Sequence, residues 1–142
     1  MNVLLIDDDA VNLELLRLRL EALNCQVLDA HTSADGLRLA AAVVPDLIVL
    51  DMRLEHAQLE GPRVLEALRE NPATFGVPVV IHSIFVTDPS DLPEGLPRAE
   101  GYLPKPFQFA ELRALVERFR PKGPLSGQAE PHRKGAWWPE AL

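Results

Sequence analysis

The chain has 142 residues, 47% of them hydrophobic, which suits one domain with its own core and argues against intrinsic disorder. Its 21 acidic residues outnumber its 14 lysines and arginines, and a net charge of −7 makes direct binding to nucleic acid or to an anionic membrane unexpected. The single cysteine, Cys25, excludes an intramolecular disulfide, and without a recognisable signal peptide after Met1 we expect a cytoplasmic protein.

Short apolar runs alternate with helical repeats along residues 1–120. Several of these runs lack any alternation of polar and apolar residues, which is typical of strands buried on both faces. The five runs expected to form strands are Val3–Ile6, Gln26–Ala30, Asp46–Leu50, Val77–His82 and Gly101–Leu103. Strands that alternate with helices predict a doubly wound α/β fold, in which a five-stranded parallel sheet has helices on both faces.

Amphipathic helices are expected after four of the five strands. The first ends near Asn24, a residue type that tolerates left-handed backbone, and the second begins after the capping pair Thr32–Ser33. The third spans about Pro62–Glu70 and the last about Phe109–Phe119. The side chains expected to face inward are Leu13, Leu16, Leu20 and Leu23, then Leu37, Ala40 and Ala41, then Val64, Leu65 and Leu68.

The segment IFVTDPSDLPEGLPRAEG separates the fourth and fifth strands and is rich in helix-breaking residues. Pro89, Pro93 and Pro97 lack backbone donors, and Gly95 costs conformational entropy in a helix. Any helix in this segment is therefore expected to be short or irregular.

The last part of the chain, residues 121–142, is rich in proline and glycine and is expected to be a tail outside the domain formed by residues 1–120. It carries the pair Trp137–Trp138, two large apolar side chains that are costly to leave in water. We expect one of them to pack on its own domain or on a second copy of the chain, near Ile84, Phe85 and Val86.

Polar residues follow four of the predicted strands. Three aspartates, Asp7–Asp9, follow the first strand, Asp51 follows the third, Ser83 the fourth and Lys105 the fifth. In an open parallel sheet, ligands bind at the carboxyl ends of the strands, near the point where the strand order reverses. The sequence therefore predicts a site that contains a carboxylate cluster, a hydroxyl group and an ammonium group.

Three adjacent carboxylates next to a buried strand repel one another, and charge near a core is costly. A bound Mg²⁺ would explain Asp7 and Asp8, because this cation takes carboxylate oxygens as ligands. For Asp9 the better explanation is local, since aspartate is a favoured N-cap of a following helix.

Four motifs occur in this order along the chain: VLLIDD, DLIVLD, PVVIHS and YLPKPF. In their residues, order and separations, they resemble the receiver domain of bacterial two-component response regulators, including chemotaxis regulators. The resemblance covers residues 2–120. The resemblance implies a flavodoxin-like sheet with strand order 2-1-3-4-5. The resemblance implies that Asp51 is the phosphoacceptor. It also implies a metal site with Asp8 and Asp51 as direct ligands, Asp7 as a ligand mainly through water and the Arg53 backbone carbonyl as a further ligand. Ser83 and Tyr102 would be switch residues, Lys105 the phosphoryl-binding lysine and Pro106 a candidate for a cis peptide.

The chemistry of these residues supports the same function. The Asp51 carboxylate could attack a phosphoryl group on a partner histidine, and Mg²⁺, or Mn²⁺ in its place, would neutralise the phosphoryl oxygens. The expected partners are a sensor histidine kinase or histidine phosphotransfer protein, a downstream protein target and a second copy of the chain. The resulting prediction is a stand-alone response regulator receiver, a signalling domain rather than an enzyme.

Two other functions fit parts of the sequence. The stretch Asp7–Val11 matches the DxDx[TV] pattern of haloacid-dehalogenase-like phosphatases, with Asp7 as nucleophile and Asp9 as acid/base. That family places a further acidic motif after its lysine, however, and no aspartate follows Asp91 here. The match also leaves DLIVLD unexplained.

The other function is a receiver that binds a partner without being phosphorylated. The loop DMRLEHAQLEGPRV is longer than usual before Gly61, has Glu55 where the family has proline and contains His56, which could approach the site. Ile84 follows Ser83 where the family generally has a small residue that leaves the phosphoryl pocket accessible. These departures bear on the rate of phosphorylation.

Overall fold

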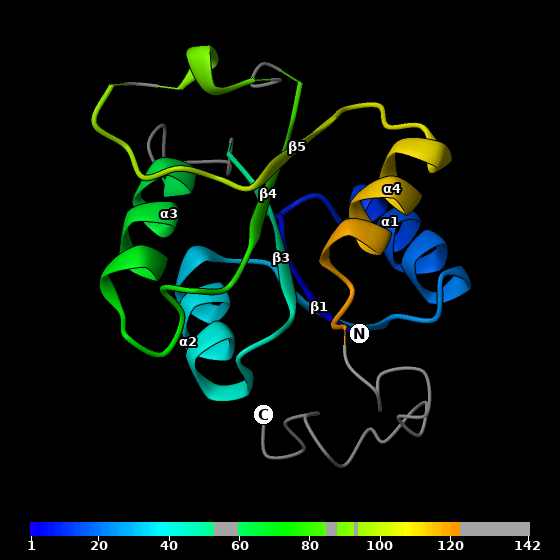
Figure 1. The fold of residues 1–142 in the computed structure, drawn as a ribbon, viewed down its shortest axis with the longest axis horizontal. Coiled ribbons are helices and arrows are strands. Elements are labelled where there is room, and N and C mark those ends of the chain that lie inside the picture. Colours follow the sequence, from blue (N-terminus) through cyan, green and yellow to red (C-terminus); the bar gives the residue numbers. More distant parts are fainter. Residues whose placement is uncertain (53–59, 85–87, 93, 123–142) are drawn as a thin grey trace.

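The computed structural model describes residues 1–52, 60–84, 88–92 and 94–122. In this part of the chain, strands and helices alternate as the sequence predicts (Figure 1). The strands are β1 (Asn2–Ile6), β2 (Gln26–Ala30), β3 (Leu47–Asp51), β4 (Val79–Ser83) and β5 (Gly101–Pro104). The helices are α1 (Ala10–Ala22), α2 (Ser33–Val43), α3 (Glu60–Glu70), the 3-10 helix η1 (Pro89–Asp91) and α4 (Phe109–Phe119).

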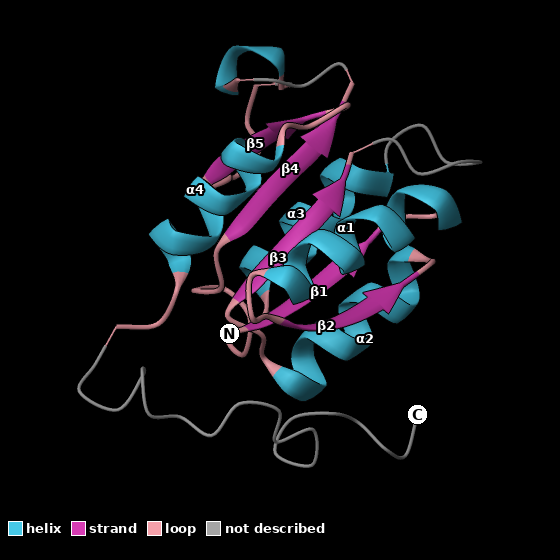
Figure 2. Cartoon of the chain, turned by 90° about the vertical axis from the view of Figure 1, so that its right-hand side faces the viewer, coloured by secondary structure: helices cyan, strands magenta, loops and turns pink. Residues whose placement is uncertain are grey.

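The five strands form one sheet in the order β2-β1-β3-β4-β5, and all neighbouring pairs are parallel (Figure 2). Helices α1 and α4 cover one face of the sheet, and α2 and α3 cover the other (Figure 1). This confirms the doubly wound, flavodoxin-like fold. The order reverses at β1, whose last residue, Ile6, pairs with Ala30 of β2 and with Leu50 of β3. The register therefore aligns the carboxyl ends of these strands at one edge.

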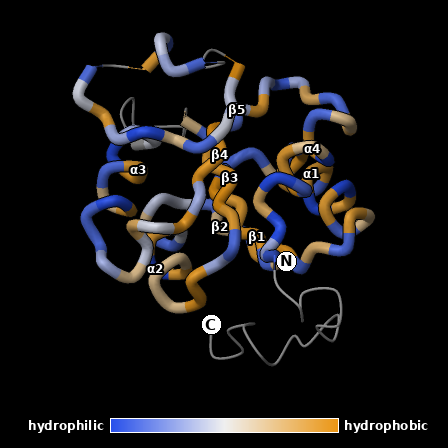
Figure 3. The backbone as a smooth tube through the Cα atoms, viewed as in Figure 1, coloured by the Kyte–Doolittle hydropathy of each residue, from blue (hydrophilic) through white to orange (hydrophobic). Residues whose placement is uncertain are grey.

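Both faces of the sheet are apolar, which explains why the strands lack alternating polarity. Leu4 and Ile6 pack towards α2 and α3, whereas Val3 and Leu5 pack towards α1 and α4. The apolar residues are concentrated in the central strands (Figure 3). Each fully buried aliphatic side chain contributes roughly 2 kcal/mol to folding, so the two core layers hold the sheet in place.

Polar residues at the helix ends have the expected local roles. The Asp9 carboxylate caps α1 by accepting hydrogen bonds from the backbone N–H groups of Val11, at 3.0 Å, and Asn12, at 3.4 Å. The Thr32 hydroxyl caps α2, and Asn24 has left-handed backbone with φ 64°. These contacts fix where each helix begins or ends, as the sequence predicts.

One detail of the predicted core is wrong. Leu39, rather than Ala41, occupies the inward face of α2 together with Ala40. The inward face is set by packing on β1, because Gly36 lies directly against Ile6 and leaves no room there for a Cβ atom. This contact fixes the rotation of α2 about its axis.

Between β4 and β5, the only helical segment among the described residues is η1, three residues long. Asp88 caps η1: its carboxylate accepts the Ser90 backbone N–H at 2.7 Å, and the Asp91 carboxylate accepts the Asp88 backbone N–H at 3.1 Å. The expectation of a short or irregular helix is confirmed. Residues 123–142, with Trp137 and Trp138, lie outside the described residues, as do Phe85 and Val86, so the expected packing of the tail stays a prediction.

Candidate functional site

Three carboxylates converge at the carboxyl edge of the sheet. Asp7 follows β1 directly, Asp51 is the last residue of β3, and Asp8 lies beside them. Each offers one carboxylate oxygen, and these oxygens all lie within 4.8 Å of one another. Asp7 is only 2% exposed and Asp51 4% exposed, whereas Asp8 is half-buried. Carboxylates held this close suit a hard divalent cation such as Mg²⁺.

Lys105, which follows β5, supplies positive charge to this cluster. Its Nζ lies 3.3 Å from Asp7 Oδ2 and 3.3 Å from Asp51 Oδ2. The Lys105 ammonium group therefore offsets part of the negative charge of the cluster. The peptide bond between Lys105 and Pro106 is cis, as the resemblance implied.

The orientation of Asp7 is fixed at both of its oxygens. The backbone N–H of Asp9 donates to Oδ1 at 2.9 Å, and the Asn12 side-chain amide donates to Oδ2 at 2.7 Å. Asp9 is the N-cap of α1 and Asn12 lies in its first turn, so the same local sequence that starts the helix also positions Asp7. A carboxylate with fixed oxygens is pre-organised for a ligand.

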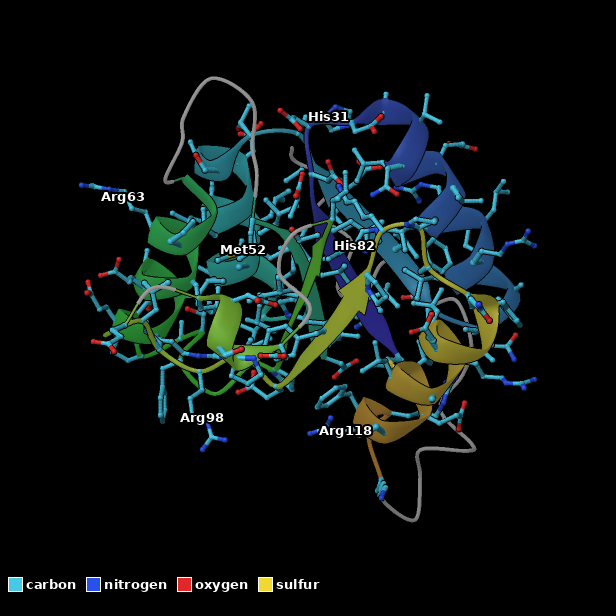
Figure 4. The ribbon with its side chains drawn as sticks, turned by 90° about the horizontal axis from the view of Figure 1, so that it is seen from above. His31, Met52, Arg63, His82, Arg98 and Arg118 are labelled. Atoms are coloured by element: carbon cyan, nitrogen blue, oxygen red, sulfur yellow. The ribbon has the colours of Figure 1, made fainter. Side chains whose placement is uncertain are left out.

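His82 is a buried polar residue that the sequence analysis did not single out. Its ring Nδ1 lies 2.9 Å from the Leu103 carbonyl oxygen, and Nε2 lies 3.3 Å from Asn12 Oδ1. Burial lowers the pKa of His82 to about 4. Figure 4 shows His82 in the middle of the molecule, whereas Arg63, Arg98 and Arg118 project from its periphery. A histidine inside the apolar run VVIHS was the signal that could have revealed it.

The two proposed switch residues differ in their surroundings. Ser83 ends β4 at the same edge and is 2% exposed, and its carbonyl oxygen accepts the Lys105 backbone N–H at 3.1 Å. Tyr102 is half-buried and packs with Leu92 and Ala99 against the core on the α2–α3 side. Burial raises the pKa of Tyr102, and the nearby Asp88 carboxylate adds to the effect.

The surroundings of Asp51 are described in part. Arg53, whose carbonyl is an expected metal ligand, lies outside the described residues, as do Glu55 and His56. Gly61, at the start of α3, lies so close to Met52 that a Cβ atom would be 2.4 Å from the Met52 Cα. Only glycine lets α3 approach the residue after Asp51 this closely. Ile84 is 63% exposed.

The fold and this edge define a doubly wound α/β domain with an acidic cluster and a lysine where ligands bind in such sheets. The model of the response regulator receiver domain matches residues 3–117. The chain therefore belongs to the family of response regulator receiver domains.

Curated relatives include the transcriptional regulatory protein KdpE of Mycobacterium tuberculosis, 39% identical over 121 residues that cover 82% of this chain and 51% of the relative. The KDP operon regulator KdpE of Escherichia coli is 34% identical over 115 residues, covering 81% of this chain and 49% of the relative. This chain thus spans about half the length of the curated relatives it matches.

Solved structures with the same fold include the receiver domain of the sensor histidine kinase PA1611 from Pseudomonas aeruginosa. It is 24% identical with a TM-score of 0.74 and covers 83% of this chain and 95% of that one. The receiver domain of the Francisella response regulator 1452 is 26% identical with a TM-score of 0.69 and covers 83% and 94%. Among the described residues of this chain, every helix is too short or too polar to cross a membrane.

Proposed function

We propose that this chain is a phosphoacceptor receiver in which Asp51 takes a phosphoryl group from the histidine of a sensor histidine kinase or histidine phosphotransfer protein. The observation that carries the proposal is the buried Asp51 carboxylate, held beside Asp7, Asp8 and Lys105 at the carboxyl edge of the sheet. A nucleophilic carboxylate surrounded by a cation site and an ammonium group suits attack on phosphorus.

In the transfer step, a carboxylate oxygen of Asp51 forms a bond to phosphorus while the bond from phosphorus to the donor's histidine nitrogen breaks. The electron pair of the broken bond stays on that nitrogen, and the product is an acyl phosphate on Asp51. The Lys105 ammonium, already 3.3 Å from Asp51, can move to a phosphoryl oxygen. The Ser83 hydroxyl, from the neighbouring strand end, can donate to another.

Asp8 and Asp51 would bind Mg²⁺ directly, with Asp7 mainly through water and the Arg53 carbonyl as a further ligand. When bound, the cation would neutralise charge on the phosphoryl oxygens. The donor set supports this assignment, because the three carboxylates offer oxygens within 4.8 Å of one another and Mg²⁺ takes carboxylate oxygens as ligands. Mn²⁺ has the same preference for oxygen ligands and is proposed as a substitute. The PA1611 receiver structure is described with magnesium in its active site cleft.

The acyl phosphate would change the surface around Ser83 and Tyr102 and so alter binding to a downstream protein or to a second copy of the chain. This is signalling by self-modification rather than turnover of a separate substrate, and the cytoplasm is the proposed compartment. The stand-alone role and the lack of direct contact with nucleic acid stay predictions for this chain. The curated relatives, about twice as long, include a protein named as a DNA-binding regulator.

Asp9 weighs against the phosphatase alternative. That mechanism requires a free carboxyl group as acid/base, whereas the Asp9 carboxylate accepts two backbone hydrogen bonds as the cap of α1. Asp7, the nucleophile in that mechanism, has both oxygens in hydrogen bonds. Asp51 would have no role in that mechanism, although it is buried in the same cluster.

The test is incubation with Mg²⁺ and acetyl phosphate, followed by intact mass measurement. We expect a phosphoryl adduct on the wild type and none on Asp51→Asn. An adduct that survives Asp51→Asn but disappears in Asp7→Asn would favour the phosphatase-like function. Absence of an adduct on every variant, also with a phosphorylated histidine donor, would favour a receiver that works without phosphorylation.

A further inference from the structure

The side-chain amide of Asn12 lies between Asp7 and His82, with its NH2 group towards Asp7 and its oxygen towards His82. Its Nδ2 lies 2.7 Å from Asp7 Oδ2, and its Oδ1 lies 3.3 Å from His82 Nε2. The other ring nitrogen of His82, Nδ1, lies 2.9 Å from the Leu103 carbonyl oxygen. A carbonyl oxygen only accepts, so Nδ1 carries a hydrogen, and in the neutral ring Nε2 then presents a lone pair.

The ring of His82 is held in this state by its surroundings. The residue is 1% exposed, and its ring packs edge-on against Phe107 with 5.8 Å between the ring centroids. Burial disfavours the charged form and lowers the pKa of His82 to about 4, so the ring is neutral near pH 7. A neutral, buried Nε2 is an acceptor that needs a donor, and the Asn12 amide lies 3.3 Å from it.

A half-turn of the Asn12 amide exchanges its donor and acceptor, so the NH2 group can face Asp7 or His82 but not both. The Asp7 carboxylate is charged and therefore the stronger acceptor. The two distances agree with this order of acceptor strength. Asn12 Nδ2 lies 2.7 Å from Asp7 Oδ2, whereas the amide oxygen faces His82 Nε2 at the longer distance of 3.3 Å. The Asn12 NH2 group therefore donates to Asp7, and His82 Nε2 is the weaker acceptor that competes for it.

We propose that Asn12 is a positioning residue for Asp7, and that His82, fixed on the Leu103 carbonyl, weakens this hold by competing for the same amide group. The inference rests on the proposed function in so far as Asp7 belongs to the cation site. The Asp9 backbone holds Oδ1, and Oδ2 is shared between the Asn12 amide at 2.7 Å and Lys105 Nζ at 3.3 Å, so Asn12 makes the shorter of these two contacts to Oδ2. The contact partners of a metal-binding carboxylate typically affect metal affinity by about 10- to 100-fold.

The two residues are therefore expected to have opposite effects on Mg²⁺ affinity. Asn12→Leu removes the donor and should weaken Mg²⁺ binding about tenfold. His82→Leu removes the competing acceptor and should strengthen it by a factor of about three, the size of a modest hydrogen-bond preference. Val11→Ala is the matched control, since Val11 is adjacent to Asn12 but 79% exposed, and it should leave the affinity unchanged.

The affinities are measured on the full chain by titrating Mg²⁺ while following the backbone amide NMR signals of residues 7–9. Wild-type affinity in Asn12→Leu, or a loss in His82→Leu as large as that in Asn12→Leu, would overturn the inference. If the wild type itself shows no Mg²⁺-dependent shifts, the metal site of the proposed function fails.

A second measurement needs no metal and covers the case in which His82→Leu does not fold. The side-chain amide signals of Asn12 are compared between the wild type and Asp7→Ala. We expect one amide proton to be shifted and protected from exchange with water in the wild type, and to lose both properties in Asp7→Ala. Identical Asn12 signals in the two proteins would show that the amide does not face Asp7, whatever the outcome of the Mg²⁺ titration.

Discussion

The two ends of the sheet both hold charged side chains, but in different arrangements. At the amino end, the Arg69 guanidinium pairs with the Glu100 carboxylate, which also accepts the Val79 backbone N–H at 2.7 Å. The remaining donors of Arg69 bind backbone carbonyl oxygens. These belong to Phe75, Val77 and Arg98.

At the carboxyl end, Lys105 pairs with Asp7 and Asp51, and Asp8 offers a third carboxylate oxygen within 4.8 Å of theirs. The pair at the amino end is neutral as a unit and joins α3 to the starts of β4 and β5, so its function is structural. The cluster at the carboxyl end instead brings three carboxylate oxygens together in a way that suits a divalent cation. Several carboxylates held together at the ends of parallel strands are evidence for a ligand, whereas a single ion pair bonded to backbone groups is evidence for a structural contact.

Replacing Arg69 by leucine is expected to have the largest effect on stability, a loss of about 3 kcal/mol in the free energy of unfolding. The change leaves Glu100 and three carbonyl groups without their partner, although the partial exposure of Glu100 moderates the cost. Urea unfolding measures the loss, and Mg²⁺ affinity should not change. Arg63→Leu, on the exposed side of the same helix, should stay within about 0.5 kcal/mol of the wild type. Equal losses in both variants would contradict a specific role for Arg69.

Lowering the pH is expected to destabilise the folded protein through His82, at the carboxyl end of the sheet. Its pKa in the folded protein is about 4 against an ordinary value of 6.5, so below pH 6.5 the unfolded chain takes up a proton that the folded chain does not. The stabilisation is complete above pH 6.5 and is lost as the pH falls to about 4. At about 1.4 kcal/mol per pKa unit, the total is at most about 3 kcal/mol.

The measurement compares the free energies of unfolding of the wild type and His82→Leu from pH 7.5 to pH 4.5 without metal. The wild type should lose stability relative to the variant across this range. Parallel pH profiles for the two proteins would show that His82 does not titrate differently in the folded and unfolded states.

Addition of Mg²⁺ should stabilise the folded protein by binding at the carboxyl end of the sheet and not at the amino end. At a concentration ten times the dissociation constant, a ligand that binds only the folded state adds about 1.4 kcal/mol. This gain should be lost in Asp8→Ala, which removes one carboxylate of the cluster, and retained in Arg69→Leu. Thermal unfolding with and without Mg²⁺ measures it. A full gain in Asp8→Ala would remove Asp8 from the metal site.

The sequence predicted the carboxyl end well because each of its groups follows an apolar strand directly. Asp7, Asp51, Ser83 and Lys105 need only the rule that parallel strands end at one edge. The same rule could not find the Asn12–His82 contact, because these residues are 70 positions apart and meet only through the packing of α1 on the sheet. The histidine in the run VVIHS is unusual for a buried strand, but nothing in the sequence names Asn12 as its partner.

The sequence analysis did not predict the Arg69–Glu100 pair at the amino end of the sheet, for the same reason. Arg69 lies in the last turn of α3, and nothing in its local sequence separates it from Arg63 on the same helix. Its partner Glu100 is 31 residues away, directly before β5. Local patterns predicted where helices begin and end, as at Asp9, Asn24 and Thr32, whereas long-range side-chain pairs depend on the assembled fold.

Lys105→Ala is expected to cost less than Arg69→Leu, about 1 kcal/mol or less in the free energy of unfolding. Lys105 makes two contacts of 3.3 Å from a partly exposed position, and the cluster that it leaves can be neutralised by a metal ion. The remaining difference from the wild type should shrink when Mg²⁺ is added. Urea unfolding with and without Mg²⁺ tests this, and a loss as large as that of Arg69→Leu would make Lys105 a structural residue.

The same variant should separate phosphorylation from the response at Tyr102. The ammonium group can move from Asp51 to a phosphoryl oxygen only once that group is present, and Lys105 lies three residues after Tyr102. Tyr102 is the only tyrosine in the chain, so fluorotyrosine labelling gives a single ¹⁹F signal. We expect acetyl phosphate with Mg²⁺ to shift this signal in the wild type but not in Lys105→Ala, even when mass measurement shows that the variant carries the phosphoryl group. An unchanged shift in phosphorylated Lys105→Ala would assign the coupling to other groups, with Ser83 the first to test.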